Sequence, residues 1–366
     1  MPLTIGNFEL HMGPKQLGAP DDLKQPIIDF IDKAEKRLDV AVQELDSWDI
    51  AKALIRARQE RKVTLRVVLE SDYLRSSKCR TDPFVQGGKY EINRQICDAL
   101  LRANINLKTD YNTSIFHQKF MVRDSEAVLT GSTNFTDRGT AHNLNHIVVI
   151  EDKDVAKIYG REFREIMQGR FGKLNEGHDP RPPEVTISGV PMKILFAPDH
   201  SPEMEIMKQM EKSRRKVDFA IFTFSKSSGI DDTIVLLEKA GIPVRGVFDG
   251  MSANQDWAAT KMVAEAGAEA HVTRKGSNGF NRENKLGKLH HKLMIIDDRV
   301  IVIGSFNYTG PANALNDENI MIIGDLKSTD AESIANQEKI GQYALKEVDR
   351  IIEEFSSKVE VVPELV

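Results

Sequence analysis

The chain has 366 residues, of which 40% are hydrophobic and 29% are charged, with a formal net charge of −5 at pH 7. This length exceeds the size at which one hydrophobic core usually stops growing, so two domains are expected, and the net charge gives no general attraction to nucleic acid or anionic membranes. Two cysteines exclude a disulfide framework, and without an apolar leader or an 18-residue apolar stretch we expect a cytoplasmic protein with no integral membrane association.

The predicted elements follow the same order twice along the chain. The first half reads as a strand within 34–45, a helical stretch, a strand at 63–71, a helix near 91–103 and the segment HQKFMVRDSEAVLTGSTNFT at 117–136. The second half reads as a strand within 212–224, a helical stretch, a strand at 242–250, a helix near 257–267 and the segment HHKLMIIDDRVIVIGSFNYT at 290–309. A helical tail is expected from about 331 to 355.

Strands that alternate with helical stretches indicate an α/β fold, with helices flanking a mixed β-sheet in each half. The stretch between the two repeats is rich in glycine, proline and charge, which is typical of a linker. We therefore expect two similar domains, at residues 1–175 and 192–366, joined by a linker at 176–191.

The first repeated segment is predicted to be a β-hairpin. Side chains alternate along a strand, so His117 and Lys119 lie on one face. A turn near Ser125 places Lys119 opposite Gly131, where the absent side chain lets the backbone approach closely.

The second repeated segment has the same predicted register. It places Lys292 opposite Gly304 and on the same face as His290. His291 then points away from this face, and we expect it to be a packing or surface residue.

The repeated polar residues bring an imidazole, an ammonium, a hydroxyl and a carboxamide together in each half. This set suits a tetrahedral anion better than a metal ion, because a lysine at its centre opposes a cation. Covalent hydrolysis at phosphorus needs both a nucleophile and an acid, and two copies facing each other supply both. The candidate catalytic residues are His117, Lys119, Ser132 and Asn134 in the first copy and His290, Lys292, Ser305 and Asn307 in the second.

Both copies resemble the H-x-K-x4-D-x6-G-S-x-N signature of the phospholipase D superfamily. The resemblance implies two domains related by a pseudo-twofold axis, an active site at their interface, and no metal or other cofactor. It also implies a phosphohistidine intermediate, in which the second histidine protonates the leaving group and then activates water. The other motif residues, Asp124, Gly131, Asp297 and Gly304, would hold the local structure.

A carboxylate downstream of the motif often orients a histidine in this family. At that position the second half has Glu318, whereas the first half has Asn145. If each group orients the histidine of its own half, His290 has the more basic imidazole and is the better nucleophile. Family precedent favours His117, so the sequence leaves the two roles open.

The pattern GSFNYT followed by NDEN most resembles the bacterial endonuclease branch of the superfamily, which implies a nucleic-acid substrate. The segment leading into the second motif, residues 271–292, supports this hypothesis because a basic loop at the mouth of the site would follow a phosphate backbone. Its basic residues are Arg274, Lys275, Arg282, Lys285 and Lys288. A solvated surface loop is the alternative interpretation.

Two other functions stay open. One is a phospholipase D or phosphatidyl transferase acting on phospholipid, although the sequence has no basic amphipathic stretch suited to a membrane surface. The other is a non-catalytic nucleic-acid-binding or scaffold protein, against which the intact motifs argue. DNA or RNA preference, targeting partners and oligomeric state cannot be read from the sequence, since a doubled motif removes the need for a dimer without forbidding one.

Overall fold

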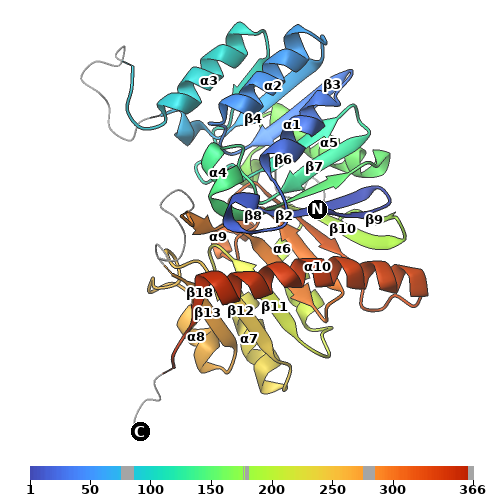
Figure 1. Ribbon diagram of the computed structural model, residues 1–366, viewed down its shortest axis with the longest axis vertical. Coiled ribbons are helices and arrows are strands. Elements are labelled where there is room, and N and C mark those ends of the chain that lie inside the picture. The colour runs from blue at the N-terminus through green and yellow to red at the C-terminus, as the bar shows by residue number, and fades with distance from the viewer. Residues whose placement is uncertain (76–85, 176, 178–180, 275–284, 362–366) are drawn as a thin grey trace.

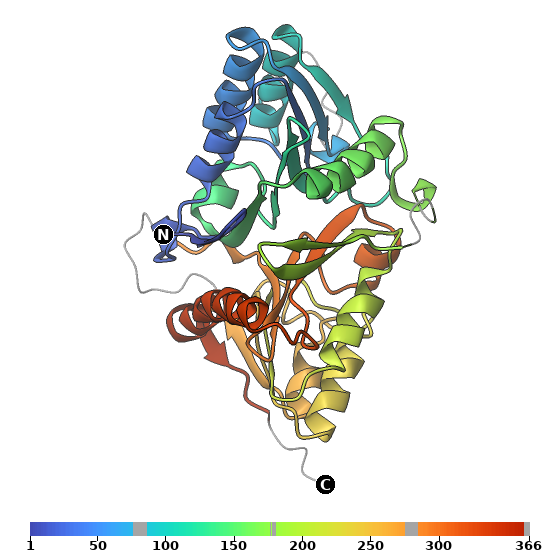
Figure 2. The same cartoon turned by 90° about the vertical axis from the view of Figure 1, so that its right-hand side faces the viewer.

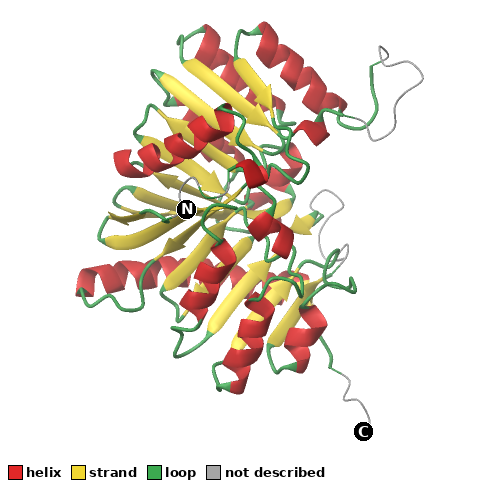
Figure 3. Cartoon of the chain, turned by 180° about the vertical axis from the view of Figure 1, so that it is seen from behind, coloured by secondary structure: helices red, strands yellow, loops and turns green. Residues whose placement is uncertain are grey.

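The computed structural model describes residues 1–75, 86–175, 177, 181–274 and 285–361. Two α/β halves lie one above the other along the long axis of the molecule, as the repeat in the sequence predicts (Figure 1). Seen from behind, the strands run through the middle of each half and the helices lie on the faces of the sheets (Figure 3).

The first half contains a mixed sheet. Its strands are β1 (Leu3–Ile5), β2 (Phe8–Gly13), β3 (Arg37–Val42), β4 (Thr64–Leu69), β5 (Asn106–Thr109), β6 (Lys119–Arg123), β7 (Ala127–Gly131) and β8 (Asn143–Ile150). Its helices are α1 (Lys24–Asp32), α2 (Trp48–Gln59), α3 (Glu91–Arg102), α4 (Asp137–Ala141) and α5 (Lys153–Met167), with short 3-10 turns at Lys15–Leu17, Ser71–Tyr73 and Gly172–Leu174. The strand order is β1-β2-β8-β7-β6-β3-β4-β5, in which β3, β4 and β5 are parallel.

The second half repeats this arrangement. Its strands are β9 (Glu184–Ile187), β10 (Val190–Ala197), β11 (Val217–Ile221), β12 (Val244–Phe248), β13 (Glu269–Thr273), β14 (Lys288–Leu289), β15 (Lys292–Ile296), β16 (Val300–Gly304), β17 (Glu318–Ile323) and β18 (Ser356–Lys358). Its helices are α6 (Pro202–Met210), α7 (Ile230–Lys239), α8 (Thr260–Glu265), α9 (Gly310–Ala314) and α10 (Ala331–Phe355). The strand order is β18-β13-β12-β11-β15-β16-β17-β10-β9.

The boundary between the halves differs from the predicted one. The second sheet begins at Glu184, so the predicted 176–191 linker already contains β9 and the start of β10. In the other direction, β14 leaves its own half and pairs in parallel with β8 of the first sheet. Glycine and proline spacing indicates where a chain turns, but it does not show which sheet the next strand joins.

A continuous hydrophobic core joins the two halves. Helices α1, α2 and α3 cover one face of the first sheet, and α6, α7 and α8 cover one face of the second. Figure 2 shows α5 (green) and α10 (red) near the boundary between the halves. The remaining faces share a single buried cluster to which α5 contributes Tyr159 and Phe163, and α10 contributes Ile340 and Val348. The halves are therefore packed as one body, with α5 and α10 between them.

Helix α10 spans the residues predicted for the helical tail. The Asp330 side chain caps its start by accepting a hydrogen bond from the Ser333 N–H at 2.7 Å. Its apolar face contacts strands of both sheets, which is why a helix of 25 residues is stable here. Neither α10 nor any other helix in the described ranges is long and apolar enough to cross a membrane.

The two motif hairpins have the predicted register. Phe120 pairs with Thr130 and Met294 pairs with Val302, which places each motif lysine opposite its motif glycine. A side chain at Gly131 would overlap the carbonyl oxygen of His146, and φ is +147° there. The glycine is therefore needed for close approach of β7 to β8 as well as for its backbone conformation.

The motif aspartates connect each hairpin to the neighbouring strand of the sheet, β3 in the first half and β11 in the second. Asp124 accepts hydrogen bonds from the backbone N–H groups of residues 35–37 at 2.7–2.8 Å, where β3 begins. Asp297 accepts the equivalent bonds from residues 214–216 at 2.8–3.0 Å, and one from Ser213 Oγ at 2.8 Å. Both carboxylates thus hold backbone groups that would otherwise lack partners.

The contribution of this carboxylate can be measured against its neighbour. Asp298 lies in the same turn, also at positive φ, but only makes ion pairs with the side chains of Arg215 and Lys216. We expect Asp297→Ala to lower the free energy of unfolding by about 2 kcal/mol more than Asp298→Ala, because orphaned backbone N–H groups cost more than partly exposed ion pairs. Urea unfolding of both variants checks this, and equal losses would contradict it.

Candidate active site

Each motif histidine is placed by the opposite half of the chain. The backbone N–H of His117 donates to the carbonyl of Asp317, and that of His290 donates to the carbonyl of Leu144, both at 2.9 Å. These crossed contacts bring the two imidazole rings together, with centroids 6.5 Å apart and planes at 77°. Both side chains are buried, so the two repeats build one site at the interface.

The Nδ1 atom of each histidine also bonds across the interface. His117 Nδ1 lies 2.6 Å from Glu318 Oε2, and His290 Nδ1 lies 2.9 Å from Asn145 Oδ1. The expectation that Glu318 orients His290 is therefore wrong, and so is the placement of Asn145 beside His117. Spacing within one repeat could not show this, because these partners become neighbours only when the halves pack together.

The motif serines hold the two orienting groups. Ser305 Oγ donates to Glu318 Oε2 at 2.6 Å, and Asn316 Nδ2 donates to the other carboxylate oxygen at 3.1 Å. Ser132 Oγ donates to Asn145 Oδ1 at 2.8 Å. Ser132 and Ser305 thus lie behind the histidines, and the expectation that their hydroxyls surround the phosphate is not met by these contacts.

Burial controls the protonation of the His117–Glu318 pair. It raises the pKa of Glu318 to about 8 and lowers the pKa of His117 well below its usual value, since both charged forms lose solvation. The ammonium of Lys119 lowers the pKa of His117 further. The 2.6 Å contact needs a proton between Nδ1 and the carboxylate, and when that proton is on Nδ1 the Nε2 atom of a neutral His117 carries the lone pair.

Two buried ammonium groups lie beside the paired histidines. Lys119 Nζ donates to the carbonyl of His117 at 2.8 Å and to Gln43 Oε1 at 3.1 Å, while Lys292 Nζ donates to the carbonyl of His290 at 2.9 Å. Burial lowers the pKa of Lys119 to about 7 and that of Lys292 well below its usual value. An anion bound between them would favour both charged forms, so the site suits a phosphate group.

The motif carboxamides retain unused hydrogen-bonding capacity. Asn134 Nδ2 donates to Gln43 Oε1 at 3.2 Å. The Oδ1 atoms of Asn134 and Asn307 are buried and have no hydrogen-bond partner among the described residues. Both side chains can therefore bind a ligand or water in the site.

Two residues that make the halves differ were not predicted from the sequence. Gln43 follows β3, and Phe222 occupies the same place after β11. Gln43 is an acceptor for the first motif, whereas the Phe222 ring lies 5.0 Å from the His290 ring, with Lys292 Nζ 5.0 Å from its centroid. Each is the first residue after the equivalent strand of its half, and this matching position could have identified them from the sequence.

The predicted basic loop is only partly described. Lys275 and Arg282 lie outside the described residues. Arg274 donates to the carbonyl of Ser356 at 2.9 and 2.6 Å, so its guanidinium anchors β18, and its role in nucleic-acid binding stays a prediction. Lys285 is exposed on the surface.

Lys288 belongs to the site itself. Its Nζ lies 4.5 Å from the centroid of the Phe222 ring, and burial lowers its pKa although the carboxylates of Asp249 and Glu44 raise it. Burial raises the pKa of Glu44 to about 7. The paired histidines are thus surrounded by three lysines and by carboxyl groups with weakened acidity.

An aromatic pair lies on the Gln43 side of the site. Gln43 Nε2 donates to the hydroxyl of Tyr73 at 3.4 Å, and the Tyr73 and Tyr90 rings are 5.0 Å apart. Lys89 Nζ lies 4.5 Å from the centroid of the Tyr90 ring. The two tyrosines are far apart in the sequence, so spacing gave no sign of this pair.

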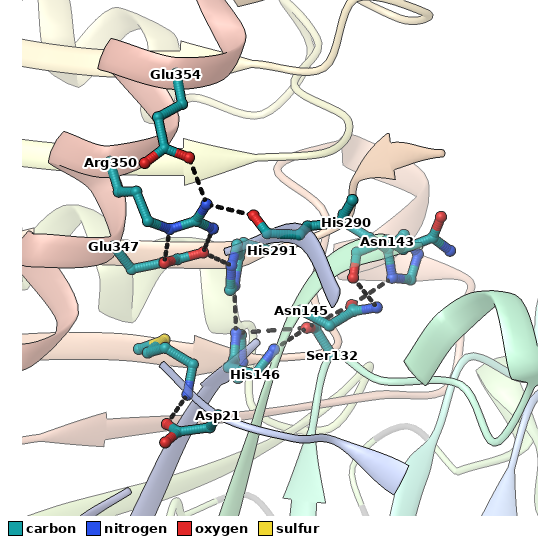
Figure 4. A network of polar contacts seen from close by, with 12 residues as sticks. Asp21, Ser132, Asn143, Asn145, His146, His290, His291, Glu347, Arg350 and Glu354 are labelled. Carbon is teal, nitrogen blue, oxygen red and sulfur yellow. Dashed lines mark hydrogen bonds and ion pairs between the residues drawn. The ribbon is translucent and has the colours of Figure 1, made fainter. Parts of the chain in front are cut away.

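His291 points away from the site and packs, as predicted, and its surroundings are polar. It is completely buried and stacks against His146, with ring planes 8° apart and Nδ1 atoms 3.1 Å apart (Figure 4). Its Nε2 atom lies 3.5 Å from Glu347 Oε1 on α10. A second histidine pair therefore lies directly behind the first.

One acidic cluster has the geometry to hold a cation. Oxygens of Glu162, Glu165 and Asp199 lie within 4.8 Å of one another, where α5 meets the segment after β10. Such clusters are common in proteins without a metal, and none of the contacts given above for the paired histidines involves these residues.

The family is decided by a match that spans both halves. A family model described as cardiolipin synthase, PLD-like domain, matches residues 27–167 and 206–337. The chain belongs to the phospholipase D superfamily. The two matched ranges contain the two motifs, so each half is one phospholipase D-like domain.

Individual relatives of this superfamily are distant. Mitochondrial cardiolipin hydrolase from Xenopus tropicalis is 27% identical over 136 residues, 37% of this chain and 57% of the relative. Phospholipase D from Rickettsia conorii is 29% identical over 133 residues, 36% of this chain and 58% of the relative. The chain thus spans little more than half the length of these relatives. The crystal structure of phosphatidylserine synthase from Haemophilus influenzae shares the fold, with a TM-score of 0.65, 13% identity, and coverage of 100% of this chain and 91% of that one.

The buried histidine pair predicts how stability depends on pH. Burial lowers the pKa of His146 and His291 in the folded state, despite Glu347, whereas both titrate near 6.5 when unfolded. Below about pH 6.5 the unfolded chain therefore binds more protons, and the free energy of unfolding falls by up to about 1.4 kcal/mol per pH unit for each histidine. The variant His146→Asn/His291→Gln should lose less stability between pH 6.5 and 5, as measured by urea unfolding. A slope equal to that of the wild type would contradict this.

Proposed function

We propose that the protein is a phosphodiesterase in which His117 is the nucleophile and His290 the general acid and base. The observation that carries this proposal is the contact between Glu318 and His117 Nδ1. A carboxylate stabilises the imidazolium-like character that develops as Nε2 bonds to phosphorus, whereas the amide of Asn145 gives His290 no such support. The argument for His290 as nucleophile depended on each group orienting the histidine of its own half, and the same chemistry applied to the observed pairing favours His117.

The proposed reaction has two steps. In the first, Nε2 of His117 attacks phosphorus, the bond from phosphorus to the leaving oxygen breaks, and His290 donates its Nε2 proton to that oxygen. In the second, His290 removes a proton from water, the water oxygen attacks phosphorus, and the phosphorus–nitrogen bond breaks with its electron pair returning to His117. The products are an alcohol and a phosphomonoester.

Lysine side chains stabilise the charge on phosphorus in both steps. Lys119 and Lys292 donate to the backbone carbonyls of His117 and His290, which holds both ammonium groups close to the paired histidines. Negative charge on the non-bridging oxygens grows in the transition state, and buried donors that are already in place stabilise it without reorganising.

Trapping the intermediate tests the assignment of roles. A radiolabelled phosphodiester, quenched at alkaline pH because phosphohistidine is labile in acid, should label the tryptic peptide TDYNTSIFHQK at 109–119. Glu318→Gln should slow labelling about 100-fold, because an amide does not stabilise the charged imidazole. Label on the peptide LHHK at 289–292 would reverse the roles, and unchanged hydrolysis in both His117→Ala and His290→Ala would support the non-catalytic alternative.

We propose nucleic acid as the substrate. The Tyr73–Tyr90 pair beside Lys119 offers stacking surface next to a phosphate site, a combination used to bind single strands. Aromatic ring faces attract cations, but Lys89 already lies over the Tyr90 ring and Lys288 over the Phe222 ring. A cationic lipid headgroup would therefore be repelled by these lysines. An anionic backbone with bases fits these surfaces better.

An anionic phospholipid is the second candidate, because the relatives named above include cardiolipin hydrolase and phospholipase D. Incubation in EDTA with single-stranded DNA, duplex DNA, RNA, phosphatidylcholine vesicles or cardiolipin vesicles separates the candidates. We expect cleavage of a single strand, and Tyr90→Leu should raise KM for it about 10-fold with little change in kcat, since one stacked base contributes about 1–3 kcal/mol. Turnover of vesicles alone would replace nucleic acid by lipid.

A further inference from the structure

The second histidine pair has a fixed direction of hydrogen bonding. The Gly304 N–H donates to His146 Nε2 at 3.2 Å, so the proton of the neutral His146 ring lies on Nδ1. That proton points to Nδ1 of His291, and the proton of His291 is therefore on Nε2, toward Glu347. Arg350 fixes this carboxylate through two hydrogen bonds of 2.9 and 2.7 Å.

Ser132 and Asn145 connect the second histidine pair to His290 of the motif (Figure 4). Ser132 Oγ accepts from the backbone N–H of His146 at 3.0 Å, lies 3.4 Å from its Nδ1, and donates to Asn145 Oδ1 at 2.8 Å. The same Asn145 oxygen faces His290 Nδ1. Asn145 Nδ2 donates to the carbonyl of Gly139 at 2.9 Å, which fixes the orientation of the amide.

The other half of the interface does without histidines. The positions equivalent to His291 and His146 are Gln118 and Asn319, and Asn319 Nδ2 donates to Gln118 Oε1 at 2.6 Å. Packing at this interface is thus compatible with a simple amide pair. The histidine pair lies behind the amide of Asn145, and the amide pair lies behind the carboxyl group of Glu318.

We propose that His146, His291 and Glu347 are positioning residues that keep the Asn145 oxygen on His290 Nδ1–H and so aim His290 Nε2 at the leaving-group oxygen. The proposal rests on the function proposed above, with His290 as the acid and base. A neutral amide holds an imidazole more weakly than a carboxylate does, so its orientation depends on the groups behind it. Glu347 on α10, together with His291 and His146, supplies those groups.

The protein itself provides a matched variant. His146→Asn/His291→Gln places on this side the amide pair that the other side already has. Protonation by His290 matters most for a poor leaving group and little for p-nitrophenolate. We expect the burst of p-nitrophenol from bis(p-nitrophenyl) phosphate to stay within about 3-fold of wild type. Formation of the phosphoenzyme from a dialkyl phosphodiester, whose leaving group is a poor one, should slow about 10- to 100-fold.

Two further variants guard against a general loss of structure. Glu347→Gln, which keeps the size of the side chain, should show the same selective effect to a smaller degree. His11→Gln removes a buried histidine that pairs with Glu9 and should leave both rates within about twofold. The thermal unfolding of each variant is measured in parallel.

The outcomes are distinct. Selective slowing with the poor leaving group supports the proposal. Equal slowing with both substrates, or no slowing with either, overturns it while leaving the proposed function intact. Absence of p-nitrophenol release by the wild-type protein overturns the proposed function and this inference with it.

Discussion

The hydrogen bond between His117 Nδ1 and Glu318 crosses the interface between the two halves, and the rest of the site depends on this crossing. The same is true of His290 and Asn145, so neither half orients its own motif histidine. A contact of this kind is useful only if the interface is rigid. The shared hydrophobic core, with α5 and α10 between the sheets, provides that rigidity.

The two halves share a scaffold but differ in electrostatics. Similar hairpins, motif aspartates and glycines place equivalent side chains at equivalent points. The residues around them then differ. The position that is Glu318 in one half is Asn145 in the other, and Gln43 corresponds to Phe222. Such differences allow two histidines with the same geometry to perform different proton chemistry.

The repeat in the sequence was enough to predict the fold and both hairpin registers, because these follow from local periodicity. That the two motifs meet followed from the two proton-handling groups that the chemistry needs and from the family resemblance. It could not predict that Glu318 serves His117, that β14 joins the first sheet, or that Arg274 anchors β18. These are contacts between distant segments, and spacing along one strand carries no information about them. The aromatic residues beside the site were missed for the same reason, since each tyrosine is isolated in the chain.

The crossed placement of the histidines has a consequence for how the protein would fail. A slight shear of one half past the other would separate both Nδ1 bonds together, while every strand and helix stayed intact. Catalytic turnover would then vanish before circular dichroism registered any change, making enzymatic rate the more sensitive gauge of how firmly the halves are seated.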